Sequence, residues 1–170
     1  MIARISTHFV CTETDLWLKI IEPKSLRFVA SPILSFIPDE SGALDGKWIV
    51  GKKYHLRLYF LKFIPLGGHT IELAEIDKAA NTISSKENGM LARVWNHDIT
   101  FHEVYPGKVR YTDRIEISAG LLSPVIWLFA HIFYRHRQQR WKLLLERQSG
   151  SEKGSSEDRR SKQGIGLHGH

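Results

Sequence analysis

Residues 124–147 read PVIWLFAHIFYRHRQQRWKLLLER, and this stretch decides the fold. Ser123 is a natural N-cap ahead of it, and Pro124 is a natural first residue of a helix. Apolar residues then recur at helical spacing along two neighbouring ridges, one with Leu122, Val125, Ile126, Phe129, Ile132 and Phe133, the other with Trp127, Tyr134 and Trp141. A helix that is apolar over more than half of its circumference must be surrounded by other elements of the fold.

The segments before this helix predict a curved sheet that can surround it. Residues 2–11 alternate like a strand, and two short helices follow, one capped by Thr12 and ending before Pro23, the other near residues 24–30. Residues 32–47 are rich in proline and glycine and predict a long surface loop. Further strands are expected at residues 54–63, 69–76, 82–91, 94–105 and 109–118, with hairpin turns at residues 78–81 and at Pro106-Gly107.

The chain of 170 residues, 42% of them hydrophobic, is the right size for one domain with a core of its own. We expect that domain at residues 1–147. Residues 148–170 are dominated by Ser, Gly and mixed charges, a composition that cannot bury a core, and we expect them to be disordered.

The excess positive charge lies near the C-terminus. Residues 1–120 hold 15 basic and 14 acidic residues, whereas residues 121–170 hold nine and four. The basic residues of the last helix, among them Arg135, Arg137 and Arg140, complement the helix dipole, and we interpret them as a solvated helix end. A basic terminus is weaker evidence for nucleic acid than a basic domain surface, so no nucleic-acid partner is expected.

Three features predict a cytoplasmic protein without a membrane span. Cys11 is the only cysteine, which excludes an intramolecular disulfide and thiolate metal clusters. The first residues lack the charged leader and apolar run of a signal peptide. The most apolar segment, residues 119–134, is shorter than the roughly 20 residues that a membrane helix needs.

Side-chain alternation places polar residues among the inward positions of the predicted sheet. His97 shares a face with Trp95, Ile99 and Phe101, and Asp113 shares one with Tyr111, Ile115 and Ile117. The same parity puts His69 with Ile71 and Leu73, and Glu87 with Ile83. A three-residue hairpin loop with Gly107 in the left-handed conformation would set Ile99 opposite Asp113 and His97 diagonal to it. Glu87, His97 and Asp113 are therefore expected to form one inward polar row.

Such a row has three possible roles: a network that satisfies itself, a group that orients a ligand, or an acid and base pair. Metal binding is not expected, because His97 and Asp98 face opposite sides of a strand, as do His102 and Glu103. No phosphate loop, nucleophile elbow or helix-borne His-Glu-x-x-His motif is present, and no cofactor is expected.

Five short motifs, in this order, resemble the SRPBCC superfamily, which includes START lipid-transfer domains, polyketide cyclases and birch-pollen-allergen-like proteins. They are Thr14-Asp-Leu-Trp17 leading to Pro23, Trp48-Ile-Val-Gly51, Trp95-Asn-His97, Tyr111-Thr-Asp113-Arg-Ile, and Tyr134-Arg-His-Arg-Gln-Gln-Arg-Trp141. The resemblance spans residues 2 to about 147. It implies the α+β helix-grip fold, in which a curved antiparallel sheet of six or seven strands wraps around a long C-terminal helix and encloses a hydrophobic cavity.

The function expected is non-catalytic binding of an apolar, aromatic or lipid-like small molecule between sheet and helix. The predicted lining is His69, Leu73, Glu87, Trp95, His97, Ile99, Phe101, Tyr111, Asp113, Ile115, Val125, Phe129 and Phe133. Two alternatives stay open. One is a cyclase-like or isomerase-like enzyme that uses His97 and Asp113 as acid and base. The other is an interaction module that binds an anionic partner through the basic helix end and the tail.

Overall fold

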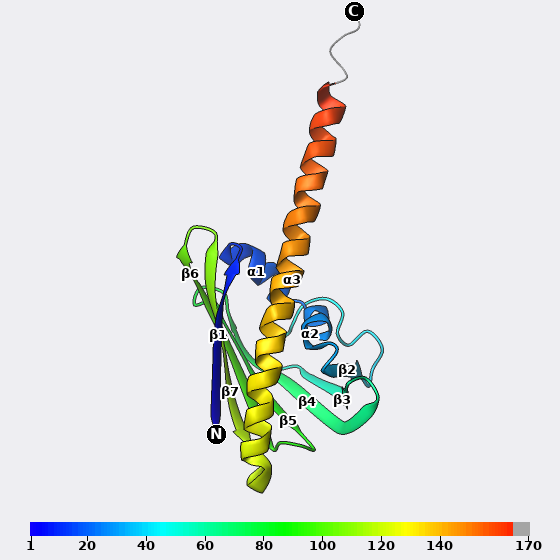
Figure 1. Cartoon of the computed structure of the whole chain (residues 1–170). Coiled ribbons are helices and arrows are strands. Elements are labelled where there is room, and N and C mark those ends of the chain that lie inside the picture. The colour runs from blue at the N-terminus through cyan, green and yellow to red at the C-terminus, as the bar shows by residue number, and fades with distance from the viewer. Residues whose placement is uncertain (165–170) are drawn as a thin grey trace, which may run out of the picture.

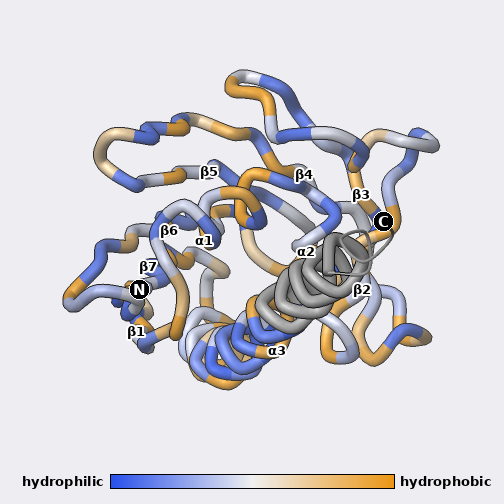
Figure 2. Tube along the Cα trace, turned by 90° about the horizontal axis from the view of Figure 1, so that it is seen from above, coloured by the Kyte–Doolittle hydropathy of each residue, from blue (hydrophilic) through white to orange (hydrophobic). Residues whose placement is uncertain are grey.

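Seven strands form one antiparallel sheet in the computed structural model of the chain, which describes residues 1–164 and the side chains of residues 1–147. The strands lie in the order β1-β7-β6-β5-β4-β3-β2. Their bounds are β1 (Ile2–Val10), β2 (Leu34–Pro38), β3 (Lys53–Phe60), β4 (Ile64–Asp77), β5 (Thr82–Gly89), β6 (Val94–Tyr105) and β7 (Lys108–Ser118). Figure 2 shows these strands as an arc, with a long helix on its open side.

Two short helices and one long helix complete the fold. The short helices α1 (Glu13–Ile20) and α2 (Pro23–Ala30) follow β1, and a 3-10 turn, η1 (Gly120–Leu122), leads into α3 (Ser123–Gly164). The predicted cap of the first helix is confirmed, because Thr12 Oγ1 accepts from Asp15 N while Asp15 Oδ2 accepts from Thr12 N. Helix α3 lies across the sheet and contacts β1, β7 and α2 (Figure 1). This arrangement is the helix-grip fold that the sequence predicts.

Residues 32–47 are not one long loop, and this prediction was wrong. They contain β2, which pairs with β3 at the edge of the sheet and buries Leu34 and Phe36. Pro38 ends this strand, which is where an edge strand tolerates a residue without a backbone N–H. The expected strand at residues 54–63 is shorter too, because Leu61 and Lys62 have left-handed backbones and turn the chain into β4.

The register of β6 and β7 is as expected, although the turn that produces it is not. Ile99 pairs with Asp113 and His97 with Ile115. Gly107 has the expected left-handed backbone, with a φ of 75°. The connection is a two-residue Pro106-Gly107 turn, and a bulge between Glu103 and Tyr105 supplies the extra residue of the three-residue loop that we expected.

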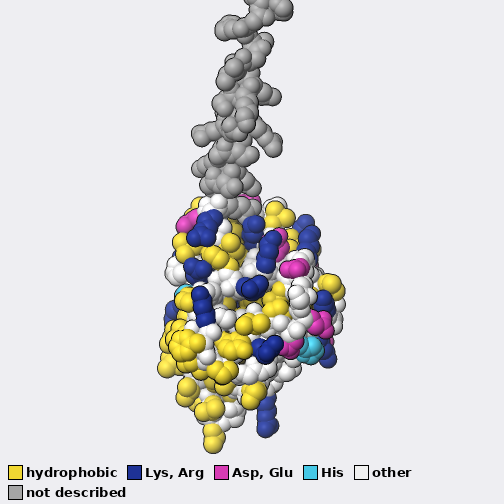
Figure 3. Space-filling model, turned by 90° about the vertical axis from the view of Figure 1, so that its right-hand side faces the viewer, with side chains coloured by type: hydrophobic (Ala, Val, Ile, Leu, Met, Phe, Trp, Pro, Cys, Tyr) yellow, Lys and Arg dark blue, Asp and Glu magenta, His cyan; other side chains and the backbone are white. Residues whose placement is uncertain are grey.

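Only one side of the long helix is covered by the sheet. Its buried residues follow helical spacing along a single stripe: Ala130, Phe133, Tyr134, Arg137, Gln138, Trp141 and Leu145. On the other side, large apolar residues in the first turns of the helix are exposed, among them Val125, Leu128 and Ile132, as is Leu122 just before it. Figure 3 shows hydrophobic side chains gathered at the lower end of this face. The expectation that the whole wide apolar face is surrounded was therefore wrong.

Helix α3 extends past the predicted end at Arg147. The predicted disordered segment, residues 148–170, has its side chains outside the described residues, and its last six residues lie outside them altogether. Its disorder therefore stays a prediction. Of the helices in the described part of the chain, none combines the length and the apolar character that crossing a membrane requires.

Candidate functional site

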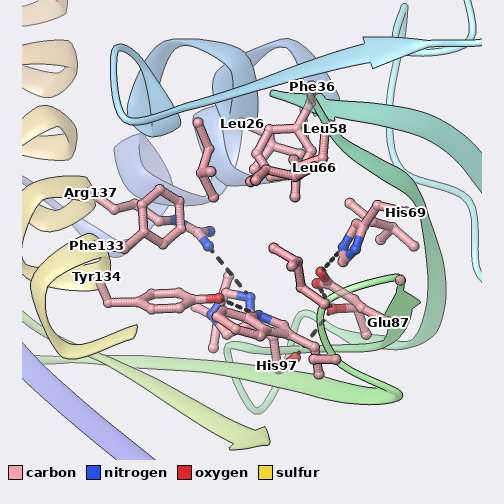
Figure 4. A pocket seen from close by; sticks show the side chains of 18 of the residues that line it. Leu26, Phe36, Leu58, Leu66, His69, Glu87, His97, Phe133, Tyr134 and Arg137 are labelled. Atoms are coloured by element: carbon pink, nitrogen blue, oxygen red, sulfur yellow. Dashed lines mark hydrogen bonds and ion pairs between the residues drawn. The ribbon is translucent and has the colours of Figure 1, made fainter. Parts of the chain in front are cut away.

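A cavity of about 110 Å³ lies between α3 and the concave face of the sheet. Most of its lining is apolar. The apolar wall includes Leu26, Phe36, Leu58, Leu66, Ile71, Leu73, Ile83, Ile99, Ile126, Phe129 and Phe133. Figure 4 shows Leu26, Phe36, Leu58 and Leu66 grouped on one side of the cavity, with His97 and Tyr134 on the other.

The pairing of β5 with β6 explains where the cavity opens. Backbone pairing between these strands ends at Ser85 and His97, although β5 continues to Gly89 in its pairing with β4. Beyond that point the lining includes Met90 and Leu91, both of which are exposed. The cavity therefore reaches the surface at the loop between β5 and β6.

His97 and Asp113 form a fully buried hydrogen-bonded pair. His97 Nε2 lies 2.8 Å from Asp113 Oδ1, and the Tyr111 hydroxyl donates to the same oxygen, also at 2.8 Å. Gln138 Nε2 on α3 donates to Asp113 Oδ2 at 2.9 Å. Three donors thus surround the carboxylate, and Asp113 lies behind His97, outside the lining of the cavity.

The charge state of Asp113 follows from these partners. Burial alone would raise the pKa of Asp113, but the hydrogen bond from His97 and the positive charge of Arg137 outweigh it and lower the pKa. Asp113 is therefore ionised at neutral pH. Burial and the neighbouring Asp113 raise the pKa of Tyr111 well above its ordinary value, so this hydroxyl remains a donor.

Glu87 belongs to a second pair, with His69 on β4. His69 Nε2 lies 2.9 Å from Glu87 Oε2, and the Ser85 hydroxyl donates to Glu87 Oε1 at 2.7 Å. Burial would raise the pKa of Glu87, but His69 more than offsets it, and the pKa is lowered. The expected single row is therefore two clusters. Ser85 lies between them, with its hydroxyl oxygen 3.4 Å from the His97 carbonyl oxygen.

Arg137 is the main site residue that sequence reasoning missed. Its side chain is 6% exposed and reaches from α3 into the cavity (Figure 4). Its Nη1 donates to His97 Nδ1 at 3.5 Å, and its guanidinium lies 5.3 Å from the centre of the Tyr134 ring. The interpretation of Arg137 as part of a solvated helix end was wrong. Helical spacing could have revealed it, because Arg137 lies midway between Phe133 and Trp141 on the buried stripe.

Eight of the thirteen predicted lining residues do border the cavity: His69, Leu73, Glu87, Trp95, His97, Ile99, Phe129 and Phe133. Phe101, Tyr111, Asp113 and Ile115 are buried in the core beyond its wall. Val125 was placed wrongly. It is 64% exposed, because the sheet does not reach that side of the helix.

A second hollow lies on the surface between α2 and α3. It is lined by Lys24, Arg27, Phe28, Ser31, Ser35, Lys62 and Arg140. Arg140 stacks on Phe28, with 4.1 Å between its guanidinium carbon and the ring centre. Four cations and no carboxylate thus line this basic groove among the described residues.

A comparison with protein-family models shows the family to which the chain belongs. The family model Domain of unknown function (DUF8410) matches residues 7–144. The chain belongs to this family. No curated protein matches the sequence. Within the residues whose side chains are described, no three His, Cys, Asp or Glu side chains converge as metal ligands would.

Solved structures share the fold at low sequence identity. Protein CV1439 from Chromobacterium violaceum superposes with a TM-score of 0.68 at 12% identity, over 85% of this chain and 96% of its own. Protein Ms6760 from Mycobacterium smegmatis gives 0.65 at 17% identity, over 86% and 92%. Ara h 8.0201 gives 0.64 at 10% identity, over 85% and 97%. At these identities the likeness establishes the helix-grip fold alone.

Proposed function

We propose that the protein binds a small, mainly apolar molecule in the cavity between α3 and the sheet, without catalysing a reaction. The observation that carries the proposal is the cavity itself, with its mainly apolar lining and its opening beside β5 and β6. Membership of the SRPBCC superfamily and a cytoplasmic location are part of the same proposal. The similarity of fold to Ara h 8.0201 supports the first of these.

The volume of the cavity limits the ligand. One water molecule needs about 10–15 Å³, whereas an engineered cavity of about 150 Å³ holds benzene. A cavity of about 110 Å³ therefore suits one aromatic ring or a short acyl chain. Larger ligands would have to extend through the opening beside Met90 and Leu91.

The surroundings of His97 favour binding over catalysis. Its Nε2 is engaged by Asp113, so Nδ1 is the nitrogen that would take a proton from a substrate. That nitrogen already accepts a hydrogen bond from Arg137 Nη1. Nδ1 of His97 therefore already faces a donor, and this favours binding over the enzyme alternative.

The test is binding of fluorobenzene, followed by ¹⁹F NMR. We expect saturable binding to the wild-type protein. Phe129→Trp should place extra ring atoms in the cavity, and losing about 50 Å² of apolar contact should weaken binding nearly tenfold. Leu128→Trp is the matched control, because the adjacent Leu128 is exposed and lies outside the lining.

Two results would contradict the proposal. The first is the absence of saturable binding to wild-type protein. The second is equal affinity in the wild type and in a folded Phe129→Trp variant. Near-ultraviolet circular dichroism checks that the Phe129→Trp variant is folded. This control is needed because the larger side chain can overpack the core, at a cost of about 1–3 kcal/mol in stability.

A second candidate function rests on the basic groove. Four cations around an aromatic ring suit an anionic partner. Of these four, Arg140 alone belongs to the basic helix end that the sequence analysis considered for this role, whereas Lys24 and Arg27 lie on α2 and Lys62 precedes β4. The measurement is sedimentation with vesicles that contain an anionic phospholipid. Binding should weaken in a Lys24→Gln/Arg27→Gln variant and at high salt. Binding that is unchanged in both comparisons would exclude this role for the groove.

A further inference from the structure

Arg137 is a buried cation that lacks a carboxylate partner. Among the described side chains, its one hydrogen bond is the 3.5 Å contact to His97 Nδ1, and no carboxylate oxygen lies within 4.0 Å of it. Its Nε is buried without a partner. Burying a charge is costly unless hydrogen bonds compensate it. A guanidinium with five donors and one long hydrogen bond therefore has capacity for an acceptor that enters the cavity.

The carboxylates in the cavity wall already have other neighbours. Glu87 is bound by His69 and Ser85. Glu22 Oε2 lies 3.4 Å from Lys24 Nζ, although this buried oxygen accepts no hydrogen bond among the described residues. Among the described residues that line the cavity, Arg137 is the only Lys or Arg.

Trp141 adds a second donor one turn further along α3. Its side chain is buried and lines the same cavity, and its Nε1 has no hydrogen-bond partner among the described residues. An indole N–H can only donate. Two side chains that line the cavity, on one stripe of one helix, thus carry buried donors without full partners.

We propose that Arg137 and Trp141 form an anion subsite, and that the natural ligand is a small amphipathic monocarboxylate whose apolar part fills the rest of the cavity. This inference rests on the proposed function, since it names the chemical class of the same ligand. One guanidinium matches one negative charge, and its planar fork matches a carboxylate. A dianion would need a second cation in the lining.

The geometry also orients this ligand. In Figure 4 the Arg137 side chain enters the cavity from α3, while Leu26, Leu58 and Leu66 form an apolar group on one side of it. The carboxylate lies against α3, and the hydrocarbon part points toward these leucines. Arg137 then exchanges its long contact with His97 for hydrogen bonds to the ligand.

A purely structural role for Arg137 makes a different prediction. The guanidinium could simply balance the charges of Asp113 and Glu87, both of which raise the pKa of Arg137 against the lowering effect of burial. In that case its removal would change stability without changing which ligand is preferred. The decisive quantity is therefore the preference between matched ligands.

The experiment compares hexanoate, 1-hexanol and hexylamine at pH 7 by titration calorimetry. The wild-type protein should bind hexanoate at least about tenfold more tightly than 1-hexanol, and hexylamine most weakly. Arg137→Gln should remove the preference for hexanoate while changing the affinity for 1-hexanol by less than about threefold. Arg137→Lys should retain part of the preference. Arg135→Gln is the matched control, because Arg135 is exposed on the same helix.

A measurement on the wild-type protein covers the case in which the variant does not fold. The Nε–Hε signal of Arg137 in a ¹⁵N spectrum should shift with hexanoate and stay in place with 1-hexanol. An unchanged signal at saturating hexanoate would overturn the subsite. So would a wild-type protein that binds 1-hexanol as tightly as hexanoate, or an Arg137→Gln variant that keeps the preference. If 1-hexanol and fluorobenzene fail to bind as well, the proposed function itself fails.

Discussion

The substitution Asp113→Asn tests whether the buried polar cluster stabilises the fold. Asp113 is 0% exposed and accepts three hydrogen bonds, from His97, Tyr111 and Gln138. An asparagine has one acceptor oxygen, so its NH₂ group would face at least one of these donors. The change also removes a negative charge that favours the buried guanidinium of Arg137, a group that has no carboxylate within ion-pair distance among the described residues. A hydrogen bond to a charged acceptor contributes about 1.5–3 kcal/mol, and a buried donor left unpaired costs about 1–3 kcal/mol, so the substitution should cost about 3–5 kcal/mol in all.

For a chain of this size, about 3–5 kcal/mol corresponds to a fall of roughly 6–20 °C in Tm. Urea unfolding at pH 7, followed by circular dichroism, measures the free energy of unfolding. Asp98→Asn is the matched control, because Asp98 pairs with Arg114 at 2.9 Å on the same two strands but is partly exposed. Its loss should cost about 1 kcal/mol or less.

The pH dependence gives the same prediction a second readout. The pKa of Asp113 is lowered by folding. Its stabilising contribution is therefore complete above the unfolded pKa of about 3.9 and is lost as the pH falls through the lower folded pKa. The stability difference between wild type and Asp113→Asn should thus be constant above about pH 5 and should narrow below about pH 4. A cost at pH 7 as small as that of Asp98→Asn, or a difference that does not narrow in acid, would refute the reasoning.

Three further predictions concern other parts of the chain. A Cβ at Gly89 would lie 2.8 Å from His69 Nδ1, so Gly89→Ala should cost about 1–3 kcal/mol, whereas Gly68→Ala has open space and should cost nothing in the same urea assay. Burial and nearby carboxylates raise the pKa of Cys11 to about 12, so alkylation by iodoacetamide at pH 8 should be roughly 1000-fold slower than for free cysteine, and a rate near that of free cysteine would contradict this environment. A chain that ends at Gln148 should melt at the same temperature as the full chain, and a fall of several degrees would show that the tail packs on the domain.

Strand alternation was sufficient to predict the inward residues of the sheet. The period of two placed His97 and Asp113 inside, and parity across the hairpin placed Ile99 opposite Asp113, as the structure has it. The partner of Glu87 could not be predicted in this way. It depends on where β5 stops pairing with β6, and this leaves Glu87 to bind His69 on the other neighbouring strand.

The helix was harder to interpret, because its apolar pattern does not say which part the sheet covers. Val125 and Ile132 fit the apolar face by spacing, yet they are exposed because the sheet does not cover that side of the helix. Arg137 was interpreted by residue type, whereas its position on the stripe of Phe133 and Trp141 decides its burial. Helical spacing therefore predicts which residues share one side of a helix. Only the packed structure shows which side faces the cavity.

The most direct test of the ligand-binding account is a crystal of the protein soaked in bromobenzene, with an anomalous difference map at the bromine absorption edge. The account predicts a bromine peak inside the cavity, among Phe129, Phe133 and Ile99, and its loss in Phe129→Trp crystals. A map with no peak in the cavity, or with bromine only on the exposed apolar face of α3, would contradict it.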